Sequence, residues 1–310
     1  MKVLIVCSGN SGLIKPFISE QALGLEKSGV IIDYFVVKGK GITGYLKNLP
    51  NLRRSIKIFQ PDLIHAHYGL SGLLSILQFR IPVIVTYHNG EILSLKVNLL
   101  SSLVSFFSKY DIYVANHIYS KLIFKKSRNF DIIPCGIDLK VMQILNSSLK
   151  KHQFIDIKKI NILFGGTFEN KRKNYSLACQ AISRITSVSV NLIELKGLSR
   201  EEVCQLLNEC YLALLPSESE GSPQFIKEAM ACNCPIVATN VGDIKEIIGN
   251  TEGCYLTSFD PDDVADKIKK AIEFGKRTDG RKKIMHFDND LIVEKLLSVY
   301  KSVINKNKLN

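Results

Sequence analysis

Short apolar runs recur along this chain, and helical patterns separate them from one another. Residues 3–7 (VLIVC) are continuously apolar, which is typical of a strand buried on both faces of a sheet. A helical pattern opens at Pro16 and closes at Gly29. Further expected strands are residues 31–37, 62–66, 82–87, 111–115, 161–164, 190–195, 212–215 and 235–239. Regular strand–helix alternation predicts an α/β protein with doubly wound parallel sheets.

The length of 310 residues suggests two domains, each large enough for its own core. Residues 141–158 are polar and lack strand patterning, as expected of a linker, and a second strand–helix alternation follows them. We expect one domain over residues 1–145 and another over residues 146–286. The remaining residues, 287–310, contain an amphipathic helical pattern.

Composition excludes several classes of protein. Hydrophobic residues make up 46% and charged residues 23%, which is ordinary for a soluble enzyme. No stretch reaches the roughly 18 uncharged apolar residues of a membrane-spanning helix, and the first residues are too short an apolar run for a secretory signal. The eight cysteines are scattered without a CxxC pair, which favours reduced thiols in a cytoplasmic protein.

The stretch from Leu214 to Ile247 contains the most informative polar residues. Ser222 followed by Pro223 predicts a helix start, with a hydroxyl N-cap and then proline where its missing N–H costs little. Glu220 precedes this helix, and Glu228 lies within it on the same face as Gln224. A helix start binds anions, so a phosphate beside these carboxylates would describe a nucleotide-sugar pocket. An ordinary βαβ unit with solvated glutamates explains the spacing equally well.

This stretch resembles the donor-site signature of retaining glycosyltransferases of family four. Glu220 and Glu228 match the family's E-x7-E pair, and the resemblance implies donor contacts from Gly221, Ser222 and Gln224. The family usually has Gly-Phe-Gly after the first glutamate, where this chain has Gly-Ser-Pro. The proline removes one backbone donor that a diphosphate could have used.

Basic residues follow another expected strand, in the segment FGGTFENKRKN. Arg172 and Lys173 could neutralise a diphosphate through charge-assisted hydrogen bonds, although a solvated charge run before a helix is the plainer interpretation. Lys173 matches the lysine of the family's G-R-x-x-x-x-K motif. Thr167 stands where the family has arginine, which makes Arg172 the candidate to replace it.

Three polar features follow expected strands in the first half. The loop from Gly9 to Gly12 could let backbone approach a diphosphate, although Gly-rich first turns are common. His65 and His67 are a poor metal pair, because no carboxylate or third ligand is near them in sequence. His88 ends a strand where a side chain would face a cleft, or else caps the next helix. The family resemblance extends to these positions and implies donor binding by Gly12 and contact of His88 with the donor sugar.

Taken together, the resemblance implies a GT-B architecture of two Rossmann-like lobes, with a C-terminal helix that packs back on the first lobe. It implies a metal-independent hexosyltransferase whose donor is a nucleotide-diphosphate sugar, with no further cofactor. Glu220 would orient the sugar ring and Glu228 would hold the ribose hydroxyls. No D-x-D follows an apolar strand, and Asp260–Asp263 is typical of a helix cap. The departures at Thr167 and Pro223 leave open a non-catalytic nucleotide-sugar-binding subunit, and a GT-B epimerase is a third candidate.

The net charge of +12 lies mainly in the first half, where residues 1–145 hold 17 Lys and Arg against 8 Asp and Glu. Such a surface suits an anionic substrate or an acidic membrane, and no nucleic-acid motif accompanies it. Basic residues cluster over 47–57 and 121–128. Between the clusters, the apolar stripe 99–107 is interleaved with serines and reads as a core face or as a membrane anchor. The resemblance implies a glycan or polyprenyl-linked acceptor in bacterial surface-polysaccharide synthesis, reached from the inner face of the plasma membrane.

Overall fold

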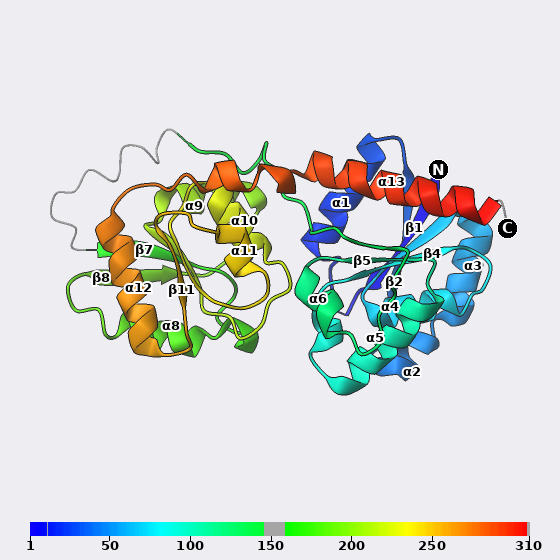
Figure 1. Cartoon of the computed structure of the whole chain (residues 1–310), viewed down its shortest axis with the longest axis horizontal. Coiled ribbons are helices and arrows are strands. Elements are labelled where there is room, and N and C mark those ends of the chain that lie inside the picture. Colours follow the sequence, from blue (N-terminus) through cyan, green and yellow to red (C-terminus); the bar gives the residue numbers. More distant parts are fainter. Residues whose placement is uncertain (11, 146–158, 309–310) are drawn as a thin grey trace. The chain divides into compact units, whose positions relative to one another are not determined.

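The structure, a computed structural model, describes residues 1–10, 12–145 and 159–308. Contacts divide it into two units, each built on its own sheet (Figure 1). The first unit comprises Met1–Gly136 and Asn289–Asn310, and the second unit is Ile137–Asp288. The boundaries predicted from the sequence fall after residues 145 and 286 instead. From residue 146 onward the expected linker lies outside the described residues.

The first unit alternates strands and helices in nearly the places that the apolar runs predict. Its elements are β1 (Lys2–Ser8), α1 (Pro16–Lys27), β2 (Ile31–Val37), α2 (Gly41–Leu46), α3 (Leu49–Phe59), β3 (Leu63–His67), α4 (Gly69–Ile76), β4 (Val83–Tyr87), the 3-10 turn η1 (Gly90–Ile92), α5 (Leu95–Phe107), β5 (Tyr110–Tyr113), α6 (Asn116–Lys121), β6 (Phe130–Ile132) and α13 (Asn289–Lys308).

The second unit repeats this alternation. Its elements are β7 (Lys159–Phe164), η2 (Lys171–Lys173), α8 (Tyr175–Ile182), β8 (Ser189–Ile193), α9 (Arg200–Glu209), β9 (Leu212–Leu215), α10 (Gln224–Ala231), β10 (Ile236–Thr239), α11 (Ile244–Ile248), β11 (Cys254–Thr257), α12 (Pro261–Phe274), η3 (Gly280–Lys283) and η4 (Met285–Phe287).

Both sheets are parallel throughout and share one strand order. The first runs β2-β1-β3-β4-β5-β6, and the second, read from its opposite edge, runs β8-β7-β9-β10-β11. In each sheet the order therefore reverses beside the first strand, between β1 and β3 and between β7 and β9. Ligands of such sheets bind beyond the carboxyl ends of the strands at this switch point. The predicted fold class, two doubly wound α/β units, is confirmed.

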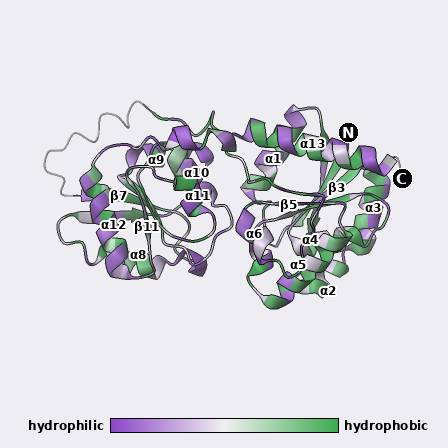
Figure 2. Cartoon of the chain, viewed as in Figure 1, coloured by the Kyte–Doolittle hydropathy of each residue, from purple (hydrophilic) through white to green (hydrophobic). Residues whose placement is uncertain are grey.

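The central strands of each sheet are buried on both faces, which explains why they read as continuous apolar runs. In β1, Leu4 and Val6 join one hydrophobic cluster while Val3, Ile5 and Cys7 join the cluster on the other face. The alternation follows from the two-residue period of a strand. Most surrounding helices carry hydrophilic and hydrophobic residues on the same ribbon, as expected of helices that cover a sheet (Figure 2).

The last helix, α13, completes the core of the first unit. It packs beside α1, as Figure 1 shows, and its buried residues join the cluster that covers one face of the sheet. These residues are Ile292, Val293, Leu296, Val299, Tyr300 and Val303. The period of 3.6 residues puts them on one face of the helix. The prediction that this helix packs back on the first lobe is confirmed.

Two helix boundaries differ from the sequence prediction. The sequence predicts a basic helix from Tyr45 to Phe59 that is interrupted at Pro50. The structure has two helices here, and the break falls at Lys47 and Asn48 instead. Pro50 instead occupies the first turn of α3, where a helix tolerates its missing N–H. The second difference is Ser222, which does not cap α10. Pro223 is the N-cap, in an extended conformation, and the helix starts at Gln224.

Candidate functional site

In the second unit, the switch point of the sheet brings a lysine and a glutamate together. Lys173, at the end of η2 after β7, places its Nζ 2.6 Å from Glu220 Oε1, in the loop after β9. Both side chains are mostly buried, with 21% and 15% of their surface exposed. A charge pair screened from water in this way interacts more strongly than one on the surface. The predicted residues Lys173 and Glu220 thus meet where such sheets bind ligands.

Glycines let this site close around its side chains. A Cβ on Gly166 would lie 2.6 Å from Lys173 Cγ, so the lysine chain lies directly against the glycine backbone. Gly242 has φ +65, and a Cβ there would lie 2.8 Å from the carbonyl oxygens of Glu220 and Gly221. Thr239 also donates to the Ser217 carbonyl at 2.6 Å, which anchors the loop after β9 to β10. The loop that carries Glu220 is therefore held in place by contacts with Thr239 and Gly242.

Glu228 lies deeper, on α10, and its side chain is 4% exposed. It forms an ion pair with Arg200, the first residue of α9. Ser199 and Glu202 fix the start of α9 by a capping box, in which each side chain accepts a hydrogen bond from the other residue's backbone N–H. The sequence predicts a helix from Ser199 to Asn208, and Ser199 is the N-cap of α9. The role of Arg200 was missed, because helix spacing does not reveal which residue of another element a first-turn side chain will meet.

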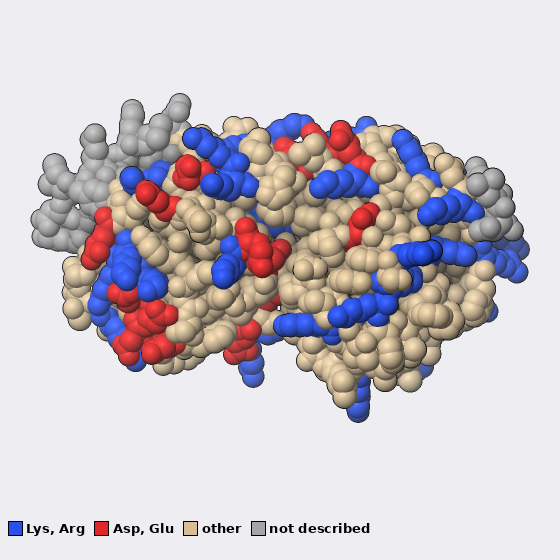
Figure 3. Space-filling view, viewed as in Figure 1, with Lys and Arg blue, Asp and Glu red and all other residues tan. Residues whose placement is uncertain are grey.

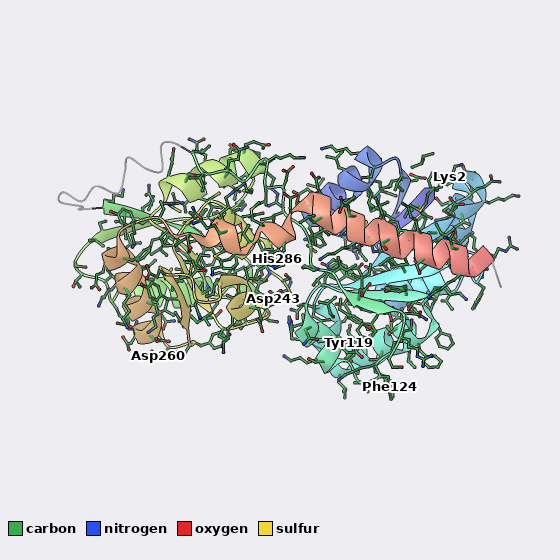
Figure 4. All side chains as sticks on the ribbon, turned by 45° about the horizontal axis from the view of Figure 1, so that its top comes forward. Lys2, Tyr119, Phe124, Asp243, Asp260 and His286 are labelled. Atoms are coloured by element: carbon green, nitrogen blue, oxygen red, sulfur yellow. The ribbon has the colours of Figure 1, made fainter. Side chains whose placement is uncertain are left out.

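No side chain caps α10. Gln224 Oε1 instead lies 3.4 Å from Lys227 Nζ, and Lys227 is fully buried over the ring of Phe287 at 4.7 Å. Asp243, labelled in Figure 4, is in the electrostatic field of Lys227. Burial raises the pKa of the Asp243 carboxyl to about 6, against the opposing effects of Lys227 and the Ser222 hydroxyl. Ser222 therefore faces Asp243 rather than serving the helix.

Arg172 and Thr167 both belong to the segment that follows β7. The Arg172 side chain is exposed, and its carbonyl accepts a hydrogen bond from the Glu218 N–H at 2.9 Å. Thr167 is half-buried in the turn after β7. The structure therefore ties η2 to the Glu220 loop through backbone, while the guanidinium of Arg172 stays at the surface. Over the face of the second unit shown in Figure 3, acidic and basic side chains are intermixed.

The first unit places its predicted residues after β1, at its switch point, and after β4. The turn after β1 closes through a hydrogen bond from the Gly12 N–H to the Gly9 carbonyl at 3.0 Å, with Gly12 at φ +85. Asn10 exchanges two hydrogen bonds with Gly39, after β2, at 2.7 and 2.9 Å. Ser11 lies outside the described residues. The turn is thus held by side-chain bonds at its start and leaves Gly12 at a position that only glycine adopts readily.

His88 belongs to a line of three imidazoles at the ends of β3 and β4. His88 Nε2 lies 3.0 Å from His67 Nδ1, and the His67 ring centroid lies 4.4 Å from that of His65. Phe17 and Tyr68 pack against the His88 ring with centroids 4.8 and 4.7 Å away. Nearby side chains therefore fix the half-buried His88 ring rather than leaving it free to turn.

The three imidazoles are neutral at physiological pH. Burial lowers the pKa of His65 and of His88 to about 3, and the pKa of His67 falls well below its usual value for the same reason. Both His65 nitrogens already have partners at 2.6 Å, the Tyr300 hydroxyl and the Thr86 hydroxyl. Across the described ranges, no three His, Cys, Asp or Glu side chains form a group that could hold a metal ion.

Glu91 is a buried residue that supports the site, and it was not predicted from the sequence. It is 1% exposed, and its carboxylate accepts hydrogen bonds from the backbone N–H groups of Gly69, His88 and Asn89 at 3.0 to 3.1 Å. Burial raises its pKa, whereas these N–H donors act in the opposite direction. The carboxylate thereby fixes the turn that carries His88. In the sequence HNGE, an acidic residue just beyond the end of the strand was the feature that could have indicated this role.

The candidate residues therefore fall into two groups, one in each unit. Glu220, Gly221, Ser222, Gln224 and Glu228 share the second unit with Arg172 and Lys173, whereas Gly12 and His88 belong to the first. Each group lies beyond the carboxyl ends of parallel strands: β7 and β9 in the second unit, and β1 and β4 in the first. A fold of two such units defines a GT-B type of protein.

Family comparison agrees with this class. Residues 2–141 match the family described as Glycosyltransferase Family 4, and residues 147–284 match Glycosyl transferases group 1. The two matches correspond closely to the two structural units. Each half of the chain thus matches a glycosyltransferase family model, and the fold is of the GT-B type.

Two curated relatives are also glycosyltransferases. An uncharacterized glycosyltransferase of Methanocaldococcus jannaschii is 28% identical over 232 residues, covering 68% of this chain and 65% of the relative. The N,N'-diacetylbacillosaminyl-diphospho-undecaprenol alpha-1,3-N-acetylgalactosaminyltransferase of Campylobacter jejuni is 26% identical over 149 residues, covering 46% of this chain and 37% of the relative. The alignments thus span less than two thirds of either relative's length.

Solved structures share the whole fold at low identity. Sucrose-phosphate synthase of Thermosynechococcus elongatus has a TM-score of 0.86 at 14% identity, with 99% of this chain and 100% of that chain covered. Anabaena HepE, solved in complex with UDP, has a TM-score of 0.74 at 16% identity, with 97% and 100% covered. The UDP-GlcNAc 2-epimerase of M. jannaschii has a TM-score of 0.61 at 12% identity, with 97% and 100% covered. Since epimerases share the fold, the family matches rather than the fold indicate a transferase.

Proposed function

We propose that this chain is a retaining, metal-independent hexosyltransferase whose donor is a nucleotide-diphosphate sugar and whose acceptor is a glycan or a polyprenyl-linked glycan. The pairing of Lys173 with Glu220 at the switch point of the second sheet carries the proposal. A cation for the diphosphate and a carboxylate for sugar hydroxyls meet there within 2.6 Å. The complex of Anabaena HepE with UDP supports a nucleotide as the ligand of this fold.

Charge development on the leaving group explains why cations are needed there. Transfer breaks the bond between the anomeric carbon and the diphosphate oxygen, and negative charge grows on that oxygen as it departs. Lys173, Arg172 and the backbone N–H groups at the start of α10 would stabilise this charge more in the transition state than in the ground state. Because Pro223 is the N-cap, the N–H groups of the first helical turn, from Gln224 onward, are retained.

The carboxylates and the imidazole would bind the donor. Glu228 would accept hydrogen bonds from the ribose hydroxyls, with Arg200 balancing its charge. Glu220 would orient the sugar ring, not act as a nucleophile. His88, being neutral, can exchange a hydrogen bond with the sugar without placing a positive charge beside the developing oxocarbenium centre. Gly12 would let the backbone of the first unit approach the donor.

The acceptor is proposed from the C. jejuni relative, whose name describes an undecaprenol-linked substrate. An acceptor of that kind is held in a membrane, so we propose a cytoplasmic enzyme that works peripherally at the inner face of the plasma membrane, in surface-polysaccharide synthesis. Across the described ranges, every helix is too short or too polar to cross a membrane. The basic clusters of the first unit would supply attraction to anionic lipid, at about 1 kcal/mol for each Lys or Arg near the surface.

Transfer from a panel of nucleotide sugars to lipid and glycan fractions, measured in excess EDTA, tests the proposal. We expect transfer to persist in EDTA and to fall by about a hundredfold or more in Lys173→Ala, because one preorganised charge contributes on that order. Complete loss in EDTA that manganese or magnesium restores would refute metal independence. Nucleotide binding with no transfer to any fraction would favour a non-catalytic subunit, and release of an altered nucleotide sugar without acceptor would favour an epimerase.

A further inference from the structure

Helix α5 turns its apolar side away from the core of the first unit. Its buried residues are Asn98, Ser101, Ser102, Val104 and Ser105. Its large apolar residues instead face outward, with Leu95 77%, Phe106 75% and Phe107 68% exposed. Leu99 and Leu103 are more than 40% exposed. The interpretation of this stripe as a core face is therefore wrong for its leucines and phenylalanines, since only Val104 of the stripe is fully buried.

Contacts on the inner side hold α5 in this orientation. A Cβ on Gly69 of α4 would lie 2.2 Å from Ser101 Oγ, so the two helices approach closely only because small residues face each other. Ser105 donates to the buried carboxylate of Asp111 at 2.6 Å, and Ser102 donates to Asn98 at 3.2 Å. Turning the helix over would bury phenylalanines where only serines fit and would break these bonds. The outward apolar side is thus a stable feature of the fold.

Neighbouring segments extend this surface. Phe79 follows α4 and is 81% exposed at a φ of 62°. Asn98 binds the backbone of Lys121 and Ile123, which places the exposed Phe124 beside the start of α5. Figure 4 shows Phe124 at the edge of its unit, and in Figure 2 hydrophobic colour predominates around α4 and α5. We call this surface the α5 face, made of Phe79, Leu95, Leu99, Leu103, Phe106, Phe107 and Phe124.

The α5 face contains a groove as well as protruding rings. A groove of about 550 Å³ runs between the end of α4 and α5. Its apolar lining is Leu73, Ile76, Leu77, Phe79, Ile81, Pro82, Val83, Leu100, Leu103, Val104 and Phe107. Such a volume suits a flexible hydrocarbon chain, and exposed aromatic rings gathered beside an apolar groove are typical of an interaction site.

The exposed charges of the segment that carries the α5 face, Leu63 to Phe130, are basic. Between Leu63 and Phe130 the only acidic residues are Glu91 and Asp111, and both are buried. The exposed basic residues of that segment are Arg80, Lys96, Lys109, Lys121, Lys125 and Arg128. Arg80 and Lys109 line the groove itself. Figure 3, drawn in the view of Figure 1, shows mainly Lys and Arg among the charged side chains on the lower part of the first unit.

We propose that the α5 face inserts into the interface of an anionic lipid bilayer, with the groove taking a lipid hydrocarbon chain. A helix of 13 residues is too short to span a bilayer, and one with phenylalanines outward and lysines beside them is suited to lie in the plane of the headgroups. Lipid phosphates would meet the basic rim formed by residues such as Arg80 and Lys109. This binding does not depend on sugar transfer, and it adds an apolar contribution that salt does not screen.

Single-tryptophan variants test insertion directly, because the chain contains no Trp. The full chain carrying Phe107→Trp is mixed with vesicles of phosphatidylcholine alone or with 30% phosphatidylglycerol. We expect a blue shift of its emission with the anionic vesicles and quenching by lipids brominated on their acyl chains. Phe259→Trp, at an apolar side chain of the second unit that is 52% exposed, is the matched control and should not shift. An unshifted Phe107→Trp spectrum with anionic vesicles would overturn the proposal.

Flotation of the full chain separates insertion from charge attraction. We expect wild type to float with anionic vesicles and partly to remain bound in 0.5 M NaCl. Phe106→Ser with Phe107→Ser should weaken binding by about tenfold or more at either salt, since each ring buries apolar area. Phe259→Ser should float like wild type, and thermal unfolding checks that each variant is folded. Equal flotation of the double variant and wild type, or a concentration-dependent dimer that the double variant abolishes, would overturn the proposal.

Discussion

Two ion pairs in the second unit differ in how deeply each partner is buried. Glu228 is almost wholly buried while Arg200 keeps 31% of its side chain exposed, whereas Lys173 and Glu220 are buried about equally. Removing Arg200 would therefore leave the buried carboxylate of Glu228 without an opposite charge. An uncompensated buried charge is strongly destabilising. A substitution that removes ligand binding but leaves the protein folded identifies a ligand-binding residue. A substitution that lowers stability without ligand identifies a residue that supports the fold.

Glu228→Ala should abolish the stabilisation of the protein by its nucleotide-sugar donor. A donor at about 100 times its dissociation constant stabilises wild type by roughly 2.7 kcal/mol, and this disappears if Glu228 holds the ribose. The measurement is a thermal-shift panel of nucleotide sugars. Glu201→Ala, at an exposed glutamate beside Arg200, is the control that should keep the shift. An unchanged shift in Glu228→Ala would remove the ribose assignment.

The free energy of unfolding should depend on pH because His65 binds a proton more readily in the unfolded chain than in the folded protein. Its pKa is about 3 in the folded protein and near 6.5 when unfolded, so between these values only the unfolded chain binds the proton. Stability should thus be fully present above pH 6.5 and fall by about 1.4 kcal/mol for this group between pH 7.5 and 5.5. His65→Gln should reduce the loss by that amount, measured as urea unfolding at both values. An identical loss in the variant would contradict a neutral buried His65.

At the scale of elements, the strands were predictable and the orientation of one helix was not. Strands buried on both faces must be apolar throughout, so runs such as residues 3–7 specify them locally. In α5, leucines and serines alternate around the helix, and which side faces inward depends on Gly69 and Gly72 of α4. Arg200 was missed for the same reason, because its partner lies on another helix. Local patterns cannot show contacts that only packing creates.

Two serines on α5 should respond oppositely to alanine. Ser105 Oγ donates to the buried Asp111, so Ser105→Ala should destabilise by about 1–3 kcal/mol. Ser101 Oγ is buried without a hydrogen-bond partner among the described residues, so Ser101→Ala should be neutral or stabilising. Urea unfolding of both variants measures the difference. Equal destabilisation by the two substitutions would argue against this inward orientation of α5.

At the scale of the whole molecule, the first unit is assembled from two distant parts of the chain. Its sheet comes from Met1–Gly136, whereas one face is covered by α13. The fully buried residues of α13 each stabilise by about 1.5–3 kcal/mol, and together they rival the 5–15 kcal/mol of a typical domain. The amphipathic pattern predicted this helix, but only the packing shows how much of the core it supplies.

Ending the chain after Asp288 should therefore unfold the first unit and spare the second. Hydrogen exchange by mass spectrometry should show lost protection in β1–β6 and retained protection in β7–β11, since each sheet has its own core. Ending the chain after Asn305 should leave both protected, because the last buried residue of α13 is Val303. Protection retained in β1–β6 without α13 would show that the first unit does not need it.

This discontinuity also bears on how the protein is made. A ribosome releases β1–β6 well before α13, with all of the second unit synthesised in between, which takes roughly ten to thirty seconds at bacterial rates. During that interval α1 alone covers the face that Val3, Ile5 and Leu63 form, and the part that α13 covers stays exposed. The second unit, being continuous, can finish folding on the ribosome first. Nascent chains should thus depend on chaperones through their first half, although that half emerges earliest.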